Sequence, residues 1–378
     1  MPIQKINIEE FLSLAKQYPV LDVRSPGEYT HAHIPTAYSL PLFNDEERKQ
    51  VGIAYKQQSR EAAIKIGLDY FGVKMKIMVE QAESMAAEFS KRINDTKVPV
   101  PPLGGGGGFL VHCWRGGMRS AAVAWLLDMY GFKVYLLSGG YKAYRKWVLA
   151  QFEKDYNFNI IGGYTGSGKT LVLHQLQKHG NTIIDLEGLA NHKGSAFGAI
   201  EKMAQPGQEM FENLLAQSFI VAGCSLTEGR GFHTNNEQQS TVIYLEDESQ
   251  RIGNLQIPMP LWYTMRKASV FFIDIPFKKR LDYITEEYGK QKKETLQEAI
   301  LRIQKRLGGL ETKNALRFLE ENNYRECFRI LLSYYDKWYH KGLYNRENIS
   351  NLLNKIPCTG VDTIINTQKI LSCNIVTA

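Results

Sequence analysis

Cysteine is scarce in this 378-residue chain, and no two cysteines stand in C-x-x-C spacing. An odd number of scattered cysteines argues against a disulfide framework and against a zinc site. It favours a reducing compartment such as the cytoplasm. The five positions are Cys113, Cys224, Cys327, Cys358 and Cys373.

Long apolar runs are also missing. No stretch reaches the roughly 20 apolar residues that span a bilayer. The first residues, M-P-I-Q-K-I-N-I-E-E, lack the charged stretch and apolar core of a secretory signal. We therefore expect a cytoplasmic protein with no membrane partner.

The charge balance is moderately basic, with 46 Lys and Arg against 39 Asp and Glu and a net charge of +7. A solvated surface with a few extra lysines explains this excess as well as a nucleic-acid or polyphosphate partner does. Composition alone does not separate the two explanations.

The order of short strands and helices predicts an α/β fold in two domains. Residues 1–150 contain predicted strands at 18–24, 109–112 and 134–137 and predicted helices at 121–130 and 141–152. Residues 151–378 contain predicted strands at 158–161, 182–185, 241–245 and 269–273, followed by a helical, charged extension over about 277–353. Such alternation is typical of parallel sheets that helices cover on both faces. Between residues 104 and 108 stand five consecutive glycines, for which we expect a flexible loop because their backbone entropy opposes regular structure.

The first chemical motif is a cysteine loop, V-H-C-W-R-G-G-M-R-S, between a predicted strand and a predicted helix. Gly116 and Gly117 allow a tight curl in which backbone N–H groups point inward. With Arg115 and Arg119 nearby, this cradle is expected to lower the pKa of Cys113 and make it a nucleophile inside an anion pocket. The same loop also matches the H-C-x5-R pattern of cysteine phosphatases, so the pocket is sized for a tetrahedral oxyanion.

The second motif, G-Y-T-G-S-G-K-T, satisfies the P-loop pattern and follows a predicted strand. The predicted diphosphate-binding residues are Gly163, Gly166, Ser167, Gly168, Lys169 and Thr170. Thr170 and Asp185 are the candidate Mg²⁺ ligands, and Glu246 and Asp247 are weaker ones. Because no guanine-reading N-K-x-D motif is present, the pattern supports polyphosphate binding better than nucleotide hydrolysis.

Residues 21–41, L-D-V-R-S-P-G-E-Y-T-H-A-H-I-P-T-A-Y-S-L-P, resemble the rhodanese signature. With the cysteine loop and the P-loop in this order, the chain from about residue 10 to 350 resembles the bacterial tRNA 2-selenouridine synthases. Three further segments agree, Y-K-Q-Q-S-R-E-A-A, D-L-E-G-L-A-N-H-K-G-S-A-F-G and E-D-E-S-Q-R-I-G.

That resemblance implies a rhodanese-like domain fused to a P-loop NTPase-like domain. It also implies two reactions on the wobble uridine in the anticodon loop of tRNA. First, geranyl diphosphate alkylates the sulfur of 2-thiouridine. Selenium from selenophosphate then replaces the geranylthio group. Selenophosphate and geranyl diphosphate would be co-substrates, Mg²⁺ a cofactor, and a selenophosphate-supplying enzyme a partner. The alternative is a rhodanese-fold cysteine phosphatase or sulfurtransferase coupled to a nucleotide-binding domain.

Overall fold

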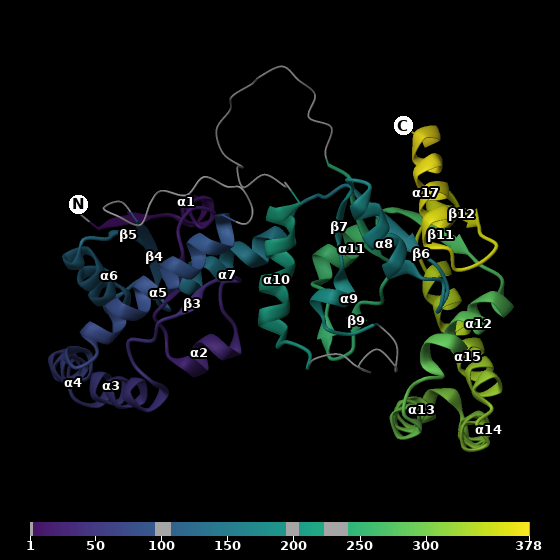
Figure 1. Cartoon of the computed structure of the whole chain (residues 1–378), viewed down its shortest axis with the longest axis horizontal. Helices are drawn as coiled ribbons and strands as arrows, with labels where there is room; N and C mark the ends of the chain where they lie inside the picture. The colour runs from purple at the N-terminus through teal and green to yellow at the C-terminus, as the bar shows by residue number, and fades with distance from the viewer. Residues whose placement is uncertain (1–2, 95–106, 194–203, 223–240, 378) are drawn as a thin grey trace. The chain divides into compact units, whose positions relative to one another are not determined.

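The computed structural model describes residues 3–94, 107–193, 204–222 and 241–377, and they form two α/β units. The first unit ends at Gln151 and the second begins at Phe152. Figure 1 traces the elements of each unit along the chain. Gly104 to Gly106, Cys224 and residues 194–198 of the D-L-E-G-L segment lie outside the described residues.

The first unit contains a five-stranded sheet in which all paired neighbours are parallel, in the order β1-β5-β4-β2-β3. Its strands are β1 (Gln4–Ile6), β2 (Val20–Asp22), β3 (Tyr38–Ser39), β4 (Gly108–His112) and β5 (Lys133–Leu137). β4, which leads into the cysteine loop, is therefore the central strand.

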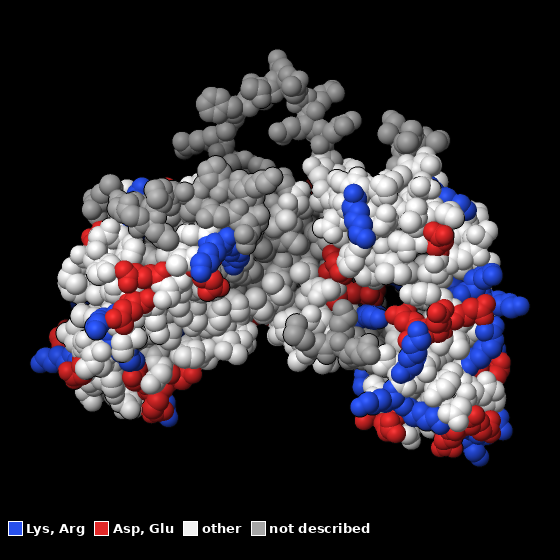
Figure 2. All heavy atoms as spheres, viewed as in Figure 1, with Lys and Arg blue, Asp and Glu red and all other residues white. Residues whose placement is uncertain are grey.

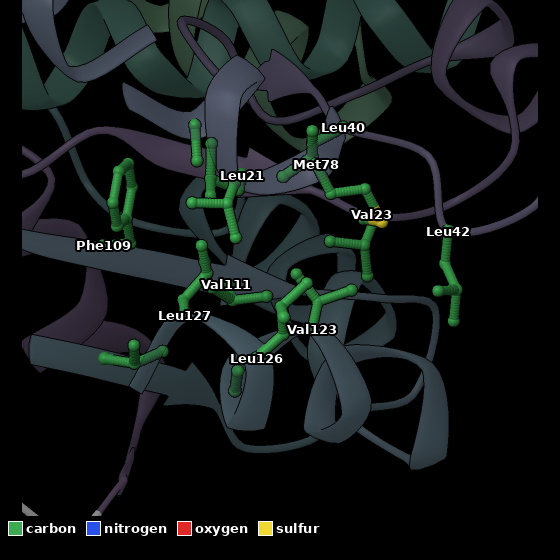
Figure 3. Packing of buried hydrophobic residues seen from close by; sticks show 14 of the residues in the cluster. Leu21, Val23, Leu40, Leu42, Met78, Phe109, Val111, Val123, Leu126 and Leu127 are labelled. Carbon is green, nitrogen blue, oxygen red and sulfur yellow. The ribbon is translucent and has the colours of Figure 1, made fainter. Parts of the chain in front are cut away.

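Seven helices accompany this sheet among the described residues. They are α1 (Ile8–Leu14), α2 (Pro26–His31), α3 (Asp45–Gln57), α4 (Arg60–Gly72), α5 (Met75–Asn94), α6 (Met118–Tyr130) and α7 (Gly140–Gln151). α5 packs against α6, whereas α1 packs against α7 and β5. Figure 3 shows the apolar core, where Leu21 and Val111 of the strands meet Val123 and Leu127 of α6. This core fixes both ends of the loop that carries Cys113.

The second unit also contains a five-stranded parallel sheet, in the order β12-β11-β6-β8-β7. Its strands are β6 (Phe158–Gly162), β7 (Thr182–Ile184), β8 (Ile243–Glu246), β11 (Ser269–Asp274) and β12 (Leu353–Pro357). A small antiparallel pair, β9 (Arg251–Ile252) and β10 (Leu255–Gln256), follows β8. β6, which leads into the P-loop, is again the central strand.

Helices of the second unit fall into two groups. Those beside the sheet are α8 (Lys169–Lys178), α9 (Leu186–Leu189), α10 (Gln208–Val221), α11 (Met259–Lys267), α16 (Ile349–Leu352) and α17 (Thr363–Thr377). The others, which we call the helical region, are α12 (Phe277–Tyr288), α13 (Lys293–Leu307), α14 (Gly309–Glu320) and α15 (Tyr324–Tyr344). The helical region has its own apolar core, which includes Leu281, Ile300, Phe328 and Leu331. No helix among the described residues is long and apolar enough to cross a membrane.

One expectation from the sequence needs correction, and the structure adds one strand that the sequence did not predict. Gly108 begins the central strand β4 instead of belonging to a flexible loop, and a side chain there would meet the Tyr18 ring at 3.0 Å and the Lys133 carbonyl oxygen at 3.2 Å. The chain after the helical extension also returns to the sheet as strand β12, which pairs with β11. Neither difference moves the two anion loops from the ends of central strands.

Candidate functional site

The cysteine loop lies between β4 and α6, at the carboxyl end of the first sheet. Gly116 has a φ of 66°, and a Cβ there would lie 2.7 Å from the Leu137 carbonyl oxygen. Gly140 has a φ of 58°, and a Cβ there would lie 2.3 Å from the Cys113 carbonyl oxygen. Only glycine fits such backbone contacts at positive φ. Gly117, in contrast, has a φ of −97° and open space around its Cα. The curl of the loop therefore depends on Gly116 and on Gly140. The sequence pattern singles out Gly116 but not Gly140.

The Cys113 thiol is 3% exposed, and its Sγ lies 3.2 Å from the Ser120 hydroxyl. Burial alone raises the pKa of this thiol. The Ser120 hydroxyl, the backbone N–H groups of Ser120 and Arg115 and the charge of Arg119 outweigh burial and lower the pKa. Cys327 is also buried, but hydrogen-bond donors do not offset the burial of its thiol. Burial therefore raises the pKa of Cys327 to about 12. The loop thus favours a thiolate at Cys113, as a nucleophile requires.

We expect Ser120→Ala to raise the pKa of Cys113, because it removes a hydroxyl that stabilises the thiolate. The rate of alkylation by iodoacetamide, followed by mass spectrometry of the Cys113 peptide, should rise with pH in both proteins. The midpoint should lie at higher pH in Ser120→Ala, so alkylation near neutral pH should be slower. Ser84→Ala, at an exposed position of α5, is the control. An unchanged midpoint in Ser120→Ala would contradict the role of the Ser120 hydroxyl.

Arg119 is held by a carboxylate. Its Nη1 donates to Glu28 Oε2 at 2.7 Å. Glu28 also accepts from the Ser25 backbone N–H at 3.0 Å, which closes the capping box at the start of α2. Burial raises the pKa of Glu28, but the bond and charge of Arg119 lower it below its ordinary value. Arg119 therefore has a fixed position near the loop, and an anion would share it with Glu28. The sequence pattern gave no sign of this partner.

Beneath the loop lies a buried polar layer. Arg24 donates from Nη2 to Asp22 Oδ2 at 2.6 Å, and its guanidinium stacks 3.8 Å from the centroid of the Tyr141 ring. His112 is fully buried, and burial lowers its pKa. Burial therefore disfavours the protonated form of His112 that a general acid would need. Arg24 and Tyr141 lie beside Trp114 of the cysteine loop.

The P-loop lies between β6 and α8, where the sequence pattern predicts it. Gly163, Gly166 and Gly168 have φ values of 153°, 78° and 73°, so each occupies a conformation that favours glycine. Lys169 Nζ donates to the Gly163 carbonyl oxygen at 3.0 Å. The backbone and this cation together form the arrangement that binds phosphates at a helix N-terminus.

Two side chains of the helical region, Tyr339 and Arg280, form hydrogen bonds with the backbone of the P-loop. The Gly163 N–H donates to the Tyr339 hydroxyl at 2.9 Å, and that hydroxyl donates to Asp247 at 2.6 Å. Arg280, 3% exposed, donates to the Thr165 carbonyl oxygen at 3.0 Å and to Asp336 at 2.7 Å. α12 and α15 therefore fix the shape of the P-loop, a long-range coupling that the local motif does not reveal.

The predicted metal ligands are arranged differently from expectation. Asp185 caps α9 by accepting from the Gly188 N–H at 2.6 Å, and it pairs with His174 at 2.8 Å. Glu187, two residues on, is the carboxylate that accepts from the Thr170 hydroxyl, at 2.9 Å. Asp185 stays a predicted ligand, and Glu187 joins it as the better placed one.

Further carboxyls gather at the end of β8. Burial, with the neighbouring Asp185 and Glu187, raises the pKa of Glu246 well above its ordinary value. Burial and Glu187 do the same for Glu248. In the part of the chain that the structure describes, three or more His, Cys, Asp or Glu side chains nowhere converge to hold a metal ion. Mg²⁺ commonly takes one or two carboxylates plus substrate phosphates, so Thr170 and Glu187 beside a bound diphosphate fit such an ion.

A cavity of about 690 Å³ opens from the P-loop toward the helical region. Gly166, Lys169 and Thr170 of the P-loop line it, together with side chains of α12 and α15. Figure 2 shows a hollow in the second unit, bordered by acidic and basic side chains. Its size falls in the range of small-molecule sites.

The fold and these loops define the class: a two-unit α/β protein with a glycine-containing cysteine loop after one central strand and a P-loop after the other. Residues 156–355 match the family model described as the tRNA 2-selenouridine synthase AAA domain. A tRNA 2-selenouridine synthase of Hydrogenovibrio crunogenus is 34% identical over 362 residues, covering 86% of this chain and 89% of the relative. One of Sulfurovum sp. is 32% identical over 365 residues, covering 89% and 91%. One of Pseudomonas putida is 36% identical over 274 residues, covering 71% and 66%.

The chain belongs to the tRNA 2-selenouridine synthase family. The family resemblance that the sequence motifs predicted is therefore confirmed.

Proposed function

We propose that this chain forms 2-selenouridine in tRNA by two reactions at the wobble position. In the first, the 2-thiouridine sulfur attacks C1 of geranyl diphosphate, the C1–O bond breaks, diphosphate leaves and the base loses its N3 proton. In the second, the Cys113 thiolate attacks the phosphorus of selenophosphate, the P–Se bond breaks and selenide is released. The selenide adds to C2, the C2–S bond breaks and geranylthiol leaves with a proton. Water then hydrolyses the phosphorylated cysteine, which releases phosphate and restores the thiol.

The observation that carries this proposal is the pairing of two different anion cradles in one chain. One holds a thiolate-forming cysteine beside Arg119. The other holds Lys169 on a P-loop that opens into a partly apolar cavity. A diphosphate leaving group suits the P-loop, where Lys169 would stabilise the charge that builds as the C1–O bond breaks. Selenophosphate suits the cysteine loop. When bound, Mg²⁺ would neutralise diphosphate charge, held by Thr170 and Glu187.

The finer assignments belong to the same proposal. The first unit is a rhodanese-like domain, an assignment that rests on the signature at residues 21–41. The partner is the anticodon loop of tRNA, whose unpaired wobble base is open to a protein and whose phosphates suit a chain of net charge +7. An enzyme that makes selenophosphate supplies the second co-substrate, and the reactions take place in the cytoplasm.

Arg119→Lys should weaken the use of selenophosphate more than geranylation, because lysine cannot replace the two-pronged guanidinium that contacts Glu28 and an anion together. The measurement is the rate of each half-reaction with its own substrate. Arg48→Lys is the matched control, since Arg48 also approaches Glu28, at 3.8 Å. Equal losses in both half-reactions would argue for a misfolded loop and against a separate selenophosphate site.

The experiment that tests the proposal supplies purified enzyme with tRNA containing 2-thiouridine and analyses the nucleosides by mass spectrometry. Geranyl diphosphate and selenophosphate together should yield 2-selenouridine. A phosphatase or sulfurtransferase would instead leave the nucleoside unselenated, and that result would overturn the proposal.

A further inference from the structure

Part of the lining of the cavity beside the P-loop is hydrocarbon. Phe328, Leu331 and Leu332 of α15 line it, although each is only 2% exposed. They belong to the apolar core of the helical region, so they form the floor of the cavity and not its rim. Tyr288 of α12 also lines the cavity, and its ring centroid lies 6.3 Å from that of Phe328. We call Phe328, Leu331 and Leu332 the apolar floor.

This apolar lining begins at the phosphate cradle itself. A Cβ built on Gly166 would lie 2.6 Å from Cδ1 of Ile284, which also lines the cavity. A ligand whose phosphates occupy the P-loop therefore lies close to the aliphatic side chain of Ile284. The side chains of the apolar floor carry no polar atom with which to read the edge of a nucleobase.

A diphosphate with an apolar tail matches these two parts of the lining. Its charged group would take the backbone N–H groups and Lys169, and its tail would displace water from the floor, which is favourable. A nucleotide base would find polar partners elsewhere in the lining, such as Gln250, Arg306 and Asn345, but none on the apolar floor, where unpaired polar groups are costly.

We propose that the apolar floor binds the hydrocarbon chain of the allylic diphosphate and limits its length to about that of a geranyl group. This inference rests on the proposed function and adds the residues that select the substrate. The bulk of Phe328, which lines the cavity, is the expected barrier to longer chains.

The test compares dimethylallyl, geranyl and farnesyl diphosphates as donors for tRNA containing 2-thiouridine. Phe328→Ala should raise the farnesyl-to-geranyl ratio of kcat/KM by about tenfold or more, the scale on which a hydrophobic pocket discriminates chain length. It should also weaken binding of geranyl diphosphate while leaving the affinity for inorganic diphosphate unchanged. Phe328→Leu should give a smaller shift in the same direction, and it keeps the test decisive where the alanine variant does not fold.

Phe318→Ala is the matched control, because Phe318 packs on the same core but does not line the cavity. It should leave the donor ratio at the wild-type value. Geranyl transfer with an unchanged ratio in both Phe328 variants would overturn this inference and leave the proposed function standing. Absence of transfer from all three donors by the wild-type enzyme would instead overturn the proposed function.

Discussion

Lys169→Ala is expected to suppress geranylation by roughly 10²-fold or more, the scale of losing one electrostatic contact to a developing charge, about 2.7 kcal/mol. Lys169 starts α8 and donates to the carbonyl oxygen of Gly163, so its ammonium lies within the phosphate cradle. The measurement is the initial rate of geranylthiouridine formation from geranyl diphosphate.

The same variant should still selenate tRNA that has been geranylated beforehand, because that step uses the cysteine loop. Lys178→Ala, an exposed lysine in the last turn of α8, is the control and should behave as wild type. Normal geranylation by Lys169→Ala would show that the P-loop does not bind the diphosphate. Strict dependence of the wild type on ATP hydrolysis would assign the P-loop an energy-coupling role.

Cys113→Ser is expected to abolish selenation while tRNA binding and geranylation persist. A serine hydroxyl stays protonated where the thiol ionises, since the donors that lower the pKa of Cys113 cannot bring an alcohol near neutrality. Nucleoside analysis after incubation with both co-substrates should therefore find the geranylated nucleoside accumulating and no 2-selenouridine.

Cys327→Ser and Cys358→Ser provide matched controls, because both thiols are buried and burial raises the pKa of each. Both variants should form 2-selenouridine at the wild-type rate per folded molecule. The folded fraction of each variant is measured to correct for any loss of stability. Normal 2-selenouridine yield from Cys113→Ser would remove Cys113 from the reaction.

The sequence was most informative where a motif and its neighbouring elements are continuous in the chain. The strand, loop and helix around Cys113 and around Lys169 follow from local patterns, and both are present. Residues 18–24 also contain the predicted strand, as β2 over Val20–Asp22. Local patterns sufficed for these elements because the strand end, the loop and the helix start lie within ten residues of each other, whereas Gly140, 27 residues after Cys113, was not predicted.

Contacts between residues far apart in the sequence could not be predicted from these local patterns. Glu28 reaches Arg119 across 91 residues of sequence, and Tyr339 reaches Gly163 across 176. Glu187 accepts from the Thr170 hydroxyl, whereas Asp185 caps the short helix α9, and the position of Asp185 at the end of a strand did not indicate this capping role. β12 was missed because its five residues follow a long helical segment and pair only with β11 from earlier in the chain.

The central claim is that the two loops serve successive reactions on one uridine, without nucleotide hydrolysis. The most direct measurement supplies the substrates to wild-type enzyme in turn, in the absence of ATP and GTP, and follows the tRNA nucleosides by mass spectrometry. The account predicts that geranyl diphosphate alone converts 2-thiouridine to the geranylated nucleoside, and that later selenophosphate converts this product to 2-selenouridine. Formation of 2-selenouridine from selenophosphate with no geranyl diphosphate present would contradict it.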